Sequence, residues 1–183
     1  VAAREKNQAL VTMCSACHHV IKRTNDAMAN DNNMNLKANN YLALETPYNG
    51  ETEVYHFLEI LRDKVGFDNL KAAVKNPLKG KKIGAYYGCL LLRPGKEMGF
   101  DDPENPTAID KLMSALGAEV VPFPLKTECC GAAMGVALKD VTSSLSGRIL
   151  ASAKAFGADA VVTACPLCHM NLDLRQGQAE RAK

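Results

Sequence analysis

The stretch VTACPLCHMNL, residues 162–172, has a near copy close to the start of the chain, VTMCSACHHVI at residues 11–21. Aligning residues 9–18 with residues 160–169 gives six identities in ten positions. A repeat of this kind indicates a repeated structural unit. It matches Cys14 with Cys165 and Cys17 with Cys168, and it also matches the histidine that follows each pair. The repeat therefore preserves residues that bind metals or exchange electrons.

The composition is typical of a globular protein with room for one large domain or two small ones. The chain has 183 residues, 47% hydrophobic and 23% charged, so a packed core needs no disulfide bonds. The net charge is only +2, which gives no electrostatic reason to expect nucleic-acid binding. No apolar stretch approaches the roughly 20 residues that span a bilayer. The chain opens on Val1 without a secretory signal, and we expect it to be truncated at both ends.

Short apolar runs alternate with segments of helical periodicity, which predicts an α/β fold with parallel strands and crossover helices. In the first part we expect a strand at residues 9–14 and helix over residues 18–45, interrupted in its Asn-rich middle. A turn follows at residues 46–52, and Thr52 is expected to cap another helix. The buried face of that helix would carry Val54, Phe57, Leu58 and Leu61.

The segment NPLKGKK, residues 76–82, marks the expected boundary between a first unit, residues 1–75, and a second unit, residues 76–183. In the second unit we expect strands at 83–89, 119–124 and 160–165, and helices at 107–116, 132–156 and from Pro166 onward. Each strand leads into cysteines: Cys89, then Cys129 and Cys130, then Cys165 and Cys168. Because ligands bind at the carboxyl ends of parallel strands, the five thiols are expected to converge.

Local features favour reactive or metal-bound thiols at these strand ends. Cys165 and Cys168 fall at a helix N-terminus, where backbone N–H groups and the helix dipole favour thiolate. Gly88 and Gly131 flank the other cysteines. They either allow close backbone approach or act as ordinary turn residues.

Several interpretations of the seven cysteines remain open. An odd number in a chain of this length fits metal or redox chemistry in a reducing compartment better than a disulfide framework. A thioredoxin-like dithiol would use only Cys165 and Cys168. A zinc site would use four thiolates of the five. An iron-sulfur cluster accepts thiolates from distant loops, and ordinary buried cysteines are the remaining alternative.

The order of the cysteines resembles that of the cysteine-rich CCG domain. Cys89 is separated by 39 residues from the Cys129-Cys130-Gly131 motif, and 34 residues lie between Cys130 and Cys165. The stretches YYGCLLLRP (86–94), CCGAAMG (129–135) and CPLCHMNLD (165–173) are similar to the B subunits of heterodisulfide reductases. The resemblance covers about residues 80–183, and residues 9–19 resemble the end of a preceding CCG unit.

This resemblance implies two Rossmann-like units related by a pseudo-two-fold axis, with short parallel sheets and an incomplete first unit. It implies an oxidoreductase that reduces the mixed disulfide of coenzyme M and coenzyme B at a non-cubane 4Fe-4S cluster. The cluster ligands, and through the cluster the catalytic residues, would be Cys89, Cys129, Cys130, Cys165 and Cys168. The disulfide would be cleaved at the cluster, so these cysteines would be ligands rather than nucleophiles.

Cys14 and Cys17 belong to a first site that lacks the earlier cysteines of a complete unit. Two thiolates do not fill an iron-sulfur or zinc shell. This site for iron or zinc is therefore truncated, completed from outside the chain, or free of metal.

The remaining polar candidates each have two interpretations. His18 and His169 either donate protons to a released thiol or lie at the surface as ordinary first-turn residues. His56 is expected at the solvent boundary of its helix. Arg93 and Lys96 either pair with an anionic substrate group or are solvated.

Tyr86 and Tyr87 cannot share one face of a strand. One is therefore expected in the core and the other toward the cleft.

A catalytic, cluster-bearing subunit is the leading functional hypothesis. The alternative is a non-catalytic electron-transfer or zinc-stabilised scaffold subunit of another redox complex, because the CCG domain serves several substrates and a fold does not fix function. No Gly-x-Gly-x-x-Gly motif for a flavin or nicotinamide occurs. Electrons are therefore expected from a ferredoxin-like iron-sulfur subunit and a flavin-containing subunit. The expected location is the cytoplasm, with any membrane contact made through other subunits.

Overall fold

Three parallel strands form the larger sheet in the computed structural model, which describes residues 1–181. The strand order is β4-β3-β5, with β3 at Lys82–Tyr86, β4 at Glu119–Val120 and β5 at Ala160–Thr163. Ile83 of β3 lies opposite Val120 of β4 and Ala160 of β5. The parallel pairing confirms the predicted α/β fold.

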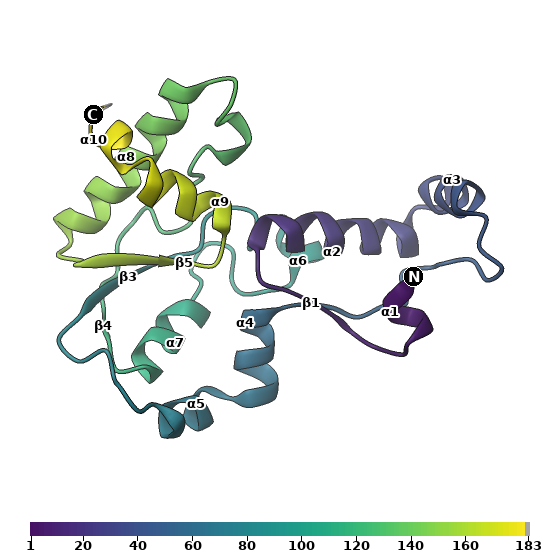
Figure 1. Cartoon of the computed structure of the whole chain (residues 1–183), viewed down its shortest axis with the longest axis horizontal. Coiled ribbons are helices and arrows are strands. Elements are labelled where there is room, and N and C mark those ends of the chain that lie inside the picture. The colour runs from purple at the N-terminus through teal and green to yellow at the C-terminus, as the bar shows by residue number, and fades with distance from the viewer. Residues whose placement is uncertain (182–183) are drawn as a thin grey trace.

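Crossover helices cover both faces of this sheet. Helix α7 (Ala108–Ala115) links β3 to β4, and α8 (Lys139–Ala155) links β4 to β5. A short helix, α6 (Gly95–Met98), lies in the loop after β3. Figure 1 shows α7 below the sheet, with α8, α9 and α10 above it. The last three elements are α9 (Pro166–His169), the π-helical turn η3 (Met170–Leu174) and α10 (Gln176–Arg181).

A second, two-stranded parallel sheet pairs β1 (Leu10–Thr12) with β2 (Val54–His56). Between these strands run α2 (Ser15–Asn30) and α3 (Asn32–Leu42). The predicted interruption lies at Asp31, whose carboxylate caps α3 by accepting the N–H groups of Asn33 and Met34. Figure 1 shows α2 extending away from the large sheet toward α3 and the short α1 (Ala2–Glu5).

The helix predicted after Thr52 is wrong at its start. Residues Val54–His56 form strand β2, and only then does the chain enter α4 (Phe57–Glu59), the π-helical turn η1 (Ile60–Val65) and α5 (Phe67–Ala73). The cap is His56, not Thr52, because its ring accepts the Leu58 N–H while Glu59 accepts the His56 N–H. His56 is 2% exposed, so its predicted boundary position is also wrong. A three-residue strand leaves too little alternation to separate it from the first turn of an amphipathic helix.

Two further boundaries differ from prediction. The helix expected over 132–156 begins only at Lys139, after the 3-10 turn η2 (Ala132–Met134). Strand β4 ends at Val120, two residues before Pro122. Proline cannot donate to a strand ladder, which explains the short strand.

The hydrophobic core has two parts, one on each face of the larger sheet. Tyr87 points to the α7 face with Leu91, Phe100 and Ile109. Tyr86 points to the α8 face with Phe123, Ile149 and three cysteines. Both tyrosines are fully buried. Neither tyrosine is exposed in a cleft, because helices cover the sheet on both faces, but Tyr86 borders three of the cysteines from within the core.

The two predicted units share part of this core. Leu58, Leu61, Phe67 and Leu70, all before residue 75, pack against the α7 face of the second sheet. Arg62 donates to the Phe100 carbonyl, and its guanidinium lies 5.3 Å from the Phe100 ring centroid. The unit boundary near residue 75 and the pseudo-two-fold axis remain predictions.

No helix within residues 1–181 has both the length and the apolar character needed to span a bilayer.

Candidate metal centre

Three loops at the carboxyl ends of the larger sheet bring the five predicted cysteines together. Cys89 follows β3, Cys129 and Cys130 lie on the loop after β4, and Cys165 follows β5 as the N-cap of α9. Cys168 lies in the first turn of the same helix. Cys130, Cys165 and Cys168 are buried, and Cys89 and Cys129 are partly exposed. The convergence predicted from strand ends is thus present in the structure.

The buried thiols form a hydrogen-bonded chain with Cys168 at its centre. The Cys168 and Cys130 sulfurs are 3.4 Å apart. Hydrogen bonds to Cys130 and Cys165, together with burial, raise the pKa of Cys168 far above its usual range. The same bond from Cys168, supported by Asn171, lowers the pKa of Cys130 to about 6 against the opposing effect of burial. The chain therefore holds one thiol protonated and makes its neighbour acidic.

Cys165 is the most acidic of these thiols. A hydrogen bond from Cys168 lowers the pKa of Cys165 to about 5, although burial opposes the shift. Backbone N–H groups of Cys168, Leu167 and Ala16 also favour the thiolate. Pro166 occupies the first helical position, where no N–H is needed. The predicted helix N-terminal effect on Cys165 is present, but a second thiol contributes more.

The pKa of Cys89 is shifted in the opposite direction to those of Cys130 and Cys165. Burial raises the pKa of Cys89 to about 12, and the nearby charges of Cys129 and Cys130 add to this. Cys129 and Cys130 therefore oppose the ionisation of Cys89. A positively charged metal would reverse this balance, because coordination deprotonates thiols outright.

Both glycines next to the cysteines have a positive φ, and Gly131 also lies against a neighbouring helix. Gly88 has φ +66°, and a methyl group placed on it would lie 3.4 Å from the Cys168 sulfur and from the Tyr86 hydroxyl. Gly131 has φ +78°, and a methyl group there would meet the Thr142 backbone at 3.1 Å. The structure thus supports the close-approach interpretation for Gly131, whereas Gly88 is favoured by its positive φ.

Side chains from α8 and η3 hold the Cys130 loop. Ser146 donates to the Cys130 carbonyl at 3.1 Å, and Thr142 donates to the Gly131 carbonyl at 3.1 Å. Asn171 lies 3.4 Å from the Cys130 carbonyl oxygen and 3.6 Å from its sulfur. All three side chains are buried. Three buried polar side chains therefore hold the loop in place, and none of them was predicted from the sequence.

Tyr86 packs against the buried cysteines from the core of the domain. Its hydroxyl donates to the Glu128 carbonyl at 2.7 Å. Burial raises the pKa of Tyr86 above its usual range, and the surrounding cysteine thiolates raise it further. The phenol therefore stays neutral beside the sulfurs.

The first Cys-x-x-Cys lies against the second rather than apart from it. Ser15 donates from both its backbone N–H and its hydroxyl to the Ala164 carbonyl, at 3.1 and 3.0 Å. Burial raises the pKa of Cys14, and the charge of Cys165 contributes. Cys17 is exposed, and its N–H donates to the Cys14 sulfur at 3.4 Å. The structure thus places Cys14 beside the five-cysteine group and Cys17 toward solvent.

A buried histidine pair behind the first Cys-x-x-Cys was not predicted. His18 is fully buried, so its expected surface position is wrong, and its Nδ1 lies 3.1 Å from the Thr12 hydroxyl. Its ring packs edge-on against His56 at 5.4 Å. Burial lowers the pKa of His18 and of His56 to about 4. Both rings are therefore neutral at pH 7, and the 3.6 Å approach of His18 to Glu59 is not an ion pair.

The other polar candidates lie at the surface or support loops. His169 is exposed and pairs with Asp173 at 3.0 Å, as expected for a residue of the first helical turn. Arg93 donates to the Thr127 carbonyl at 3.1 Å and pairs with Glu104 at 2.9 Å, so it braces the loop before Cys129. Lys96 is exposed.

The donor set suits a cluster of several metal atoms held by thiolates. Among the described residues, no three Cys, His, Asp or Glu side chains meet the geometry of a site for one metal ion. The five donors are all sulfur and come from three loops. Iron-sulfur clusters are held by such thiolate sets. The residues present therefore fit an iron-sulfur group by donor chemistry.

Comparisons with known proteins place a cysteine-rich domain over the part of the chain that carries these five cysteines. A family model described as the cysteine-rich domain CCG matches residues 83–173. The chain is 35% identical to the 8-methylmenaquinol:fumarate reductase membrane anchor subunit of Wolinella succinogenes, over 98% of this chain and 62% of that protein. It is 33% identical to the B subunit of a CoB-CoM heterodisulfide reductase of Methanosarcina acetivorans, over 96% of this chain and 59% of that protein. A corresponding subunit of Methanosarcina mazei is 31% identical, again over 96% and 59%. The chain spans about 60% of the length of these curated relatives.

Proposed function

Since this chain belongs to the family of proteins that carry the cysteine-rich CCG domain, we propose that it is the iron-sulfur subunit of a heterodisulfide reductase-type oxidoreductase. The observation that carries the proposal is the convergence of five thiols from three strand ends, with buried Cys130 and Cys165 already acidic. The similarity to subunits named for CoB-CoM heterodisulfide reductases supports this choice of reaction.

In this proposal Cys89, Cys129, Cys130, Cys165 and Cys168 hold a non-cubane 4Fe-4S cluster. Such a cluster, when bound, would pass two electrons from the partner subunits to a disulfide, which with two protons would leave as two thiols. Asn171 and Ser146 keep the Cys130 loop in place, and Tyr86 stays neutral beside the sulfurs. Hydrogen bonds to the sulfurs, such as that from Asn171, tune a cluster's potential.

The proposed partners are a ferredoxin-like iron-sulfur subunit and a flavin-containing subunit of the same complex. The relatives are named as subunits, which supports a multisubunit assembly. The proposed location is the cytoplasm, with any membrane contact made through other subunits.

A direct experiment is anaerobic reconstitution followed by measurement of iron, acid-labile sulfide and zinc per chain. We expect on the order of four iron atoms with matching sulfide, and loss of most of this iron in each of the five single Cys→Ser variants. Cys17→Ser is the matched control, because Cys17 is exposed, and it should keep the iron. Zinc in place of iron, or one silent variant among the five, would contradict the five-ligand cluster.

One observation favours a second candidate. The relative at 35% identity is named as a membrane anchor subunit of a fumarate reductase. A non-catalytic electron-transfer or zinc-stabilised scaffold subunit of such a redox complex is therefore the alternative. Anaerobic reduction assays separate the two, because only a catalytic subunit reduces a disulfide with an artificial electron donor in the absence of its partners.

A further inference from the structure

The first turn of α2 is hydrogen-bonded to the loop that carries Cys165. Ser15, the first residue of this helix, donates its N–H and its hydroxyl to the Ala164 carbonyl, at 3.1 and 3.0 Å. Ser15 is 1% exposed, and Ala164 directly precedes Cys165. The next residue, Ala16, packs against the core that contains the buried cysteines, and its N–H contributes to the lowered pKa of Cys165. Ser15 therefore fixes the Cys165 loop from the side of the first unit.

One turn further along α2, His19 is bonded to the loop that carries Cys89. Its Nδ1 lies 3.1 Å from the Leu90 carbonyl oxygen. A carbonyl oxygen can only accept, so Nδ1 carries the proton and donates it into this bond. Leu90 directly follows Cys89. Helix α2 thus contacts two of the three cysteine loops, whereas side chains of α8 and η3 hold the third, at Cys130.

The second copy of the repeat lacks these two side chains. At the offset of the aligned segments, Ser15 corresponds to Pro166, and His19 corresponds to Met170. Proline has no N–H and no hydroxyl, and a methionine side chain donates no hydrogen bond. Helix α9 therefore cannot make the same bonds toward the first unit. The contacts run in one direction, from the first Cys-x-x-Cys helix to the loops of the second unit.

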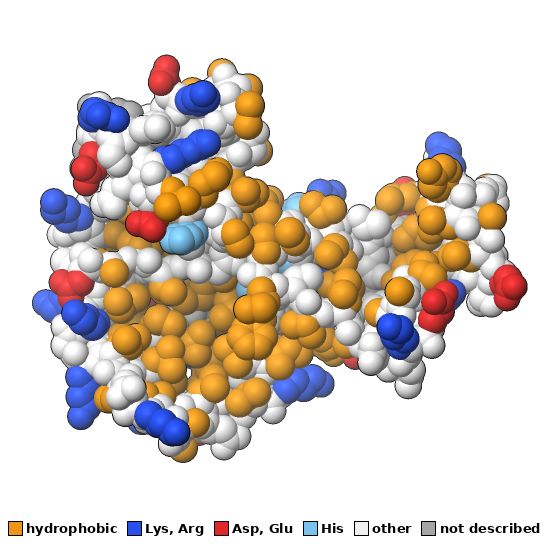
Figure 2. Space-filling model, viewed as in Figure 1, with side chains coloured by type: hydrophobic (Ala, Val, Ile, Leu, Met, Phe, Trp, Pro, Cys, Tyr) orange, Lys and Arg blue, Asp and Glu red, His pale blue; other side chains and the backbone are white. Residues whose placement is uncertain are grey.

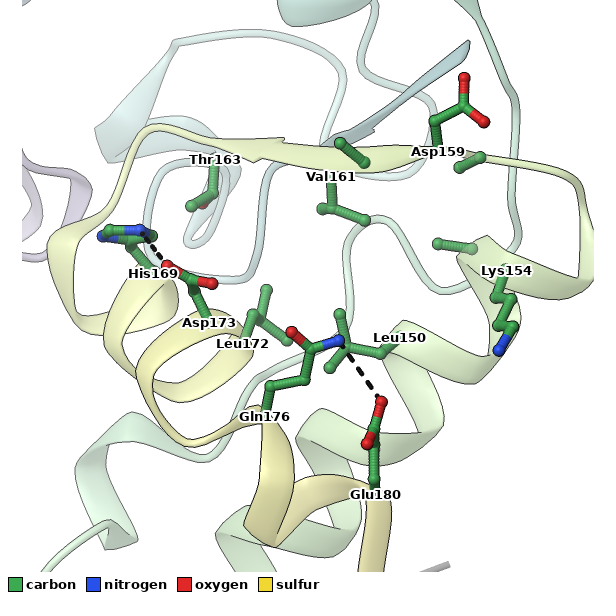
Figure 3. A pocket seen from close by; sticks show the side chains of 14 residues that line it. Leu150, Lys154, Asp159, Val161, Thr163, His169, Leu172, Asp173, Gln176 and Glu180 are labelled. Atoms are coloured by element: carbon green, nitrogen blue, oxygen red, sulfur yellow. Dashed lines mark hydrogen bonds and ion pairs between the residues drawn. The ribbon is translucent and has the colours of Figure 1, made fainter. Parts of the chain in front are cut away.

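Hydrogen bonds make the polar contacts between α2 and the second unit. Within residues 1–181 these hydrogen bonds are the ones from Ser15 and His19. Figure 2 shows mainly hydrophobic and uncharged side chains over this junction. The α9 histidine takes no part in it, because Figure 3 shows His169 directed toward Asp173 of the following turn. Hydrogen bonds in such an apolar environment are stronger than those in water, so their loss is costly.

We propose that Ser15 and His19 are positioning residues for the five-cysteine group. Through them α2 holds the Cys165 and Cys89 loops in the relative position that a shared group of metal atoms needs. Residues that orient metal ligands from outside the ligand shell influence the affinity and the potential of the site. The effect on a cluster rests on the function proposed above, whereas the hold on the two loops is a property of the chain alone.

Ser15→Pro is the sharpest variant, because it removes both bonds to Ala164 at once. Proline is accepted at the first position of a helix, as Pro166 shows in the repeat. Cys14 already has the extended backbone, φ −137° and ψ 120°, that a following proline requires. Ser15→Ala removes only the hydroxyl bond, and Ser15→Thr keeps it. Thr24→Ala is the matched control, because Thr24 is an exposed residue of the same helix.

Backbone amide exchange, followed by NMR on the full chain, reports on each loop separately. The reporter amides are His169, bonded to the Cys165 carbonyl, Arg93, bonded to the Cys89 carbonyl, and Met134, bonded to the Gly131 carbonyl. Ser15→Pro should speed exchange at His169 at least about tenfold, and Ser15→Ala about fivefold, because the loop opens locally when two or one buried hydrogen bonds are lost. Exchange at Met134 should not change, and Thr24→Ala should exchange as the unmodified chain does.

The role of His19 is tested in the same way. His19→Phe keeps a ring of similar size and removes its donor, so it should speed exchange at Arg93 about fivefold and leave His169 unchanged. His19→Asn places an amide N–H near the position of Nδ1 and should restore slow exchange. Where Ser15→Pro does not fold, Ser15→Ala decides. Unchanged exchange at His169 would overturn the proposal, and so would equal acceleration at all three loops, which would indicate a general loss of stability.

The potential of the reconstituted cluster separates this inference from the proposed function. In redox titrations followed by EPR, Ser15→Pro should shift the midpoint potential to a more negative value, because the N–H groups around the Cys165 sulfur are displaced. Ser15→Thr should keep the potential of the unmodified chain. A chain without iron after reconstitution would refute the cluster, and the exchange rates would still decide the role of Ser15. An unshifted potential in Ser15→Pro with iron bound would show that α2 does not position the ligands.

Discussion

Gly88 shows how one residue without a side chain shapes the cysteine group. It adopts φ +66°, as does Gly80 at φ +73° in the preceding loop. An added methyl group on Gly80 meets nothing within 4 Å, whereas on Gly88 it lies beside the Cys168 sulfur. A methyl group at either position would therefore cause similar backbone strain, because both glycines have a positive φ. Only at Gly88 would the methyl group also contact neighbouring side chains.

We expect Gly88→Ala and Gly80→Ala to lower the free energy of unfolding by similar amounts, about 1–2 kcal/mol each. Only Gly88→Ala should reduce the iron bound after reconstitution, because its methyl group enters the space beside Cys168. Denaturant unfolding and iron analysis of both variants test this. Equal iron content in the two variants would argue against a cluster next to Gly88.

His56 links burial to acid sensitivity. Its folded-state pKa, about 4, lies below the ordinary value of 6.5, so the unfolded chain binds the proton more readily. The stabilisation from the neutral ring is therefore complete above pH 6.5 and is lost as pH falls toward 4. Between pH 7 and pH 5 this loss amounts to about 2 kcal/mol.

The His56→Asn variant should show a smaller loss of stability between pH 7 and pH 5, because asparagine caps α4 without titrating. Urea unfolding at both pH values measures the difference. His169→Asn is the control, since that ring is exposed, and it should retain the pH dependence of the unmodified chain. An identical pH dependence in His56→Asn would show that the ring does not carry the effect.

At the scale of elements, α8 and α10 cross closely at Gly147. A methyl group on Gly147 would clash with the Ala179 carbonyl oxygen, and Ala179 is fully buried. Gly177, within α10, has nothing within 4 Å of such a group. The crossing requires a glycine on α8, whereas the helix α10 does not require one.

The same substitution should therefore have opposite effects at the two positions. Gly147→Ala is expected to destabilise the protein by about 1–3 kcal/mol through overpacking. Gly177→Ala is expected to stabilise it by up to about 1 kcal/mol through helix propensity. Thermal unfolding monitored by circular dichroism compares them. A stabilising Gly147→Ala would mean that α10 is not docked at this crossing.

At the scale of the whole molecule, the two predicted units are joined by polar and apolar contacts. Ser15 binds the Ala164 carbonyl, the His19 ring lies 3.1 Å from the Leu90 carbonyl oxygen, and residues 58–70 complete the core on the α7 face. The core of one unit thus depends on the other. Such sharing favours a single cooperative transition.

We expect scanning calorimetry of the whole chain to give one transition whose calorimetric and van't Hoff enthalpies agree. Ser15→Ala should shift this transition to lower temperature without splitting it, because a buried hydrogen bond contributes about 1 kcal/mol. Two resolved transitions would instead support units that fold independently on either side of residue 75.

The errors in the prediction have a common origin. The helix expected to start at Thr52 and the boundary position of His56 were both inferred from local periodicity. A segment as short as Val54–His56 carries little periodicity, and pairing with β1 decided its structure. The surface interpretation of His18 failed because the first turn of α2 packs against the end of β5, where Ser15 binds a residue 149 positions away in the sequence.

The amino-acid sequence was enough to predict the parallel α/β fold, the order of the elements in the second half and the convergence of five cysteines. Those features follow from periodicity, from strand-ending glycines and from the rule that parallel strands end on one edge of the sheet. The folded structure was needed to show which thiols are acidic and that His18 and His56 are buried. These properties depend on neighbours that are distant in the sequence, because burial, charge and hydrogen bonding act through space.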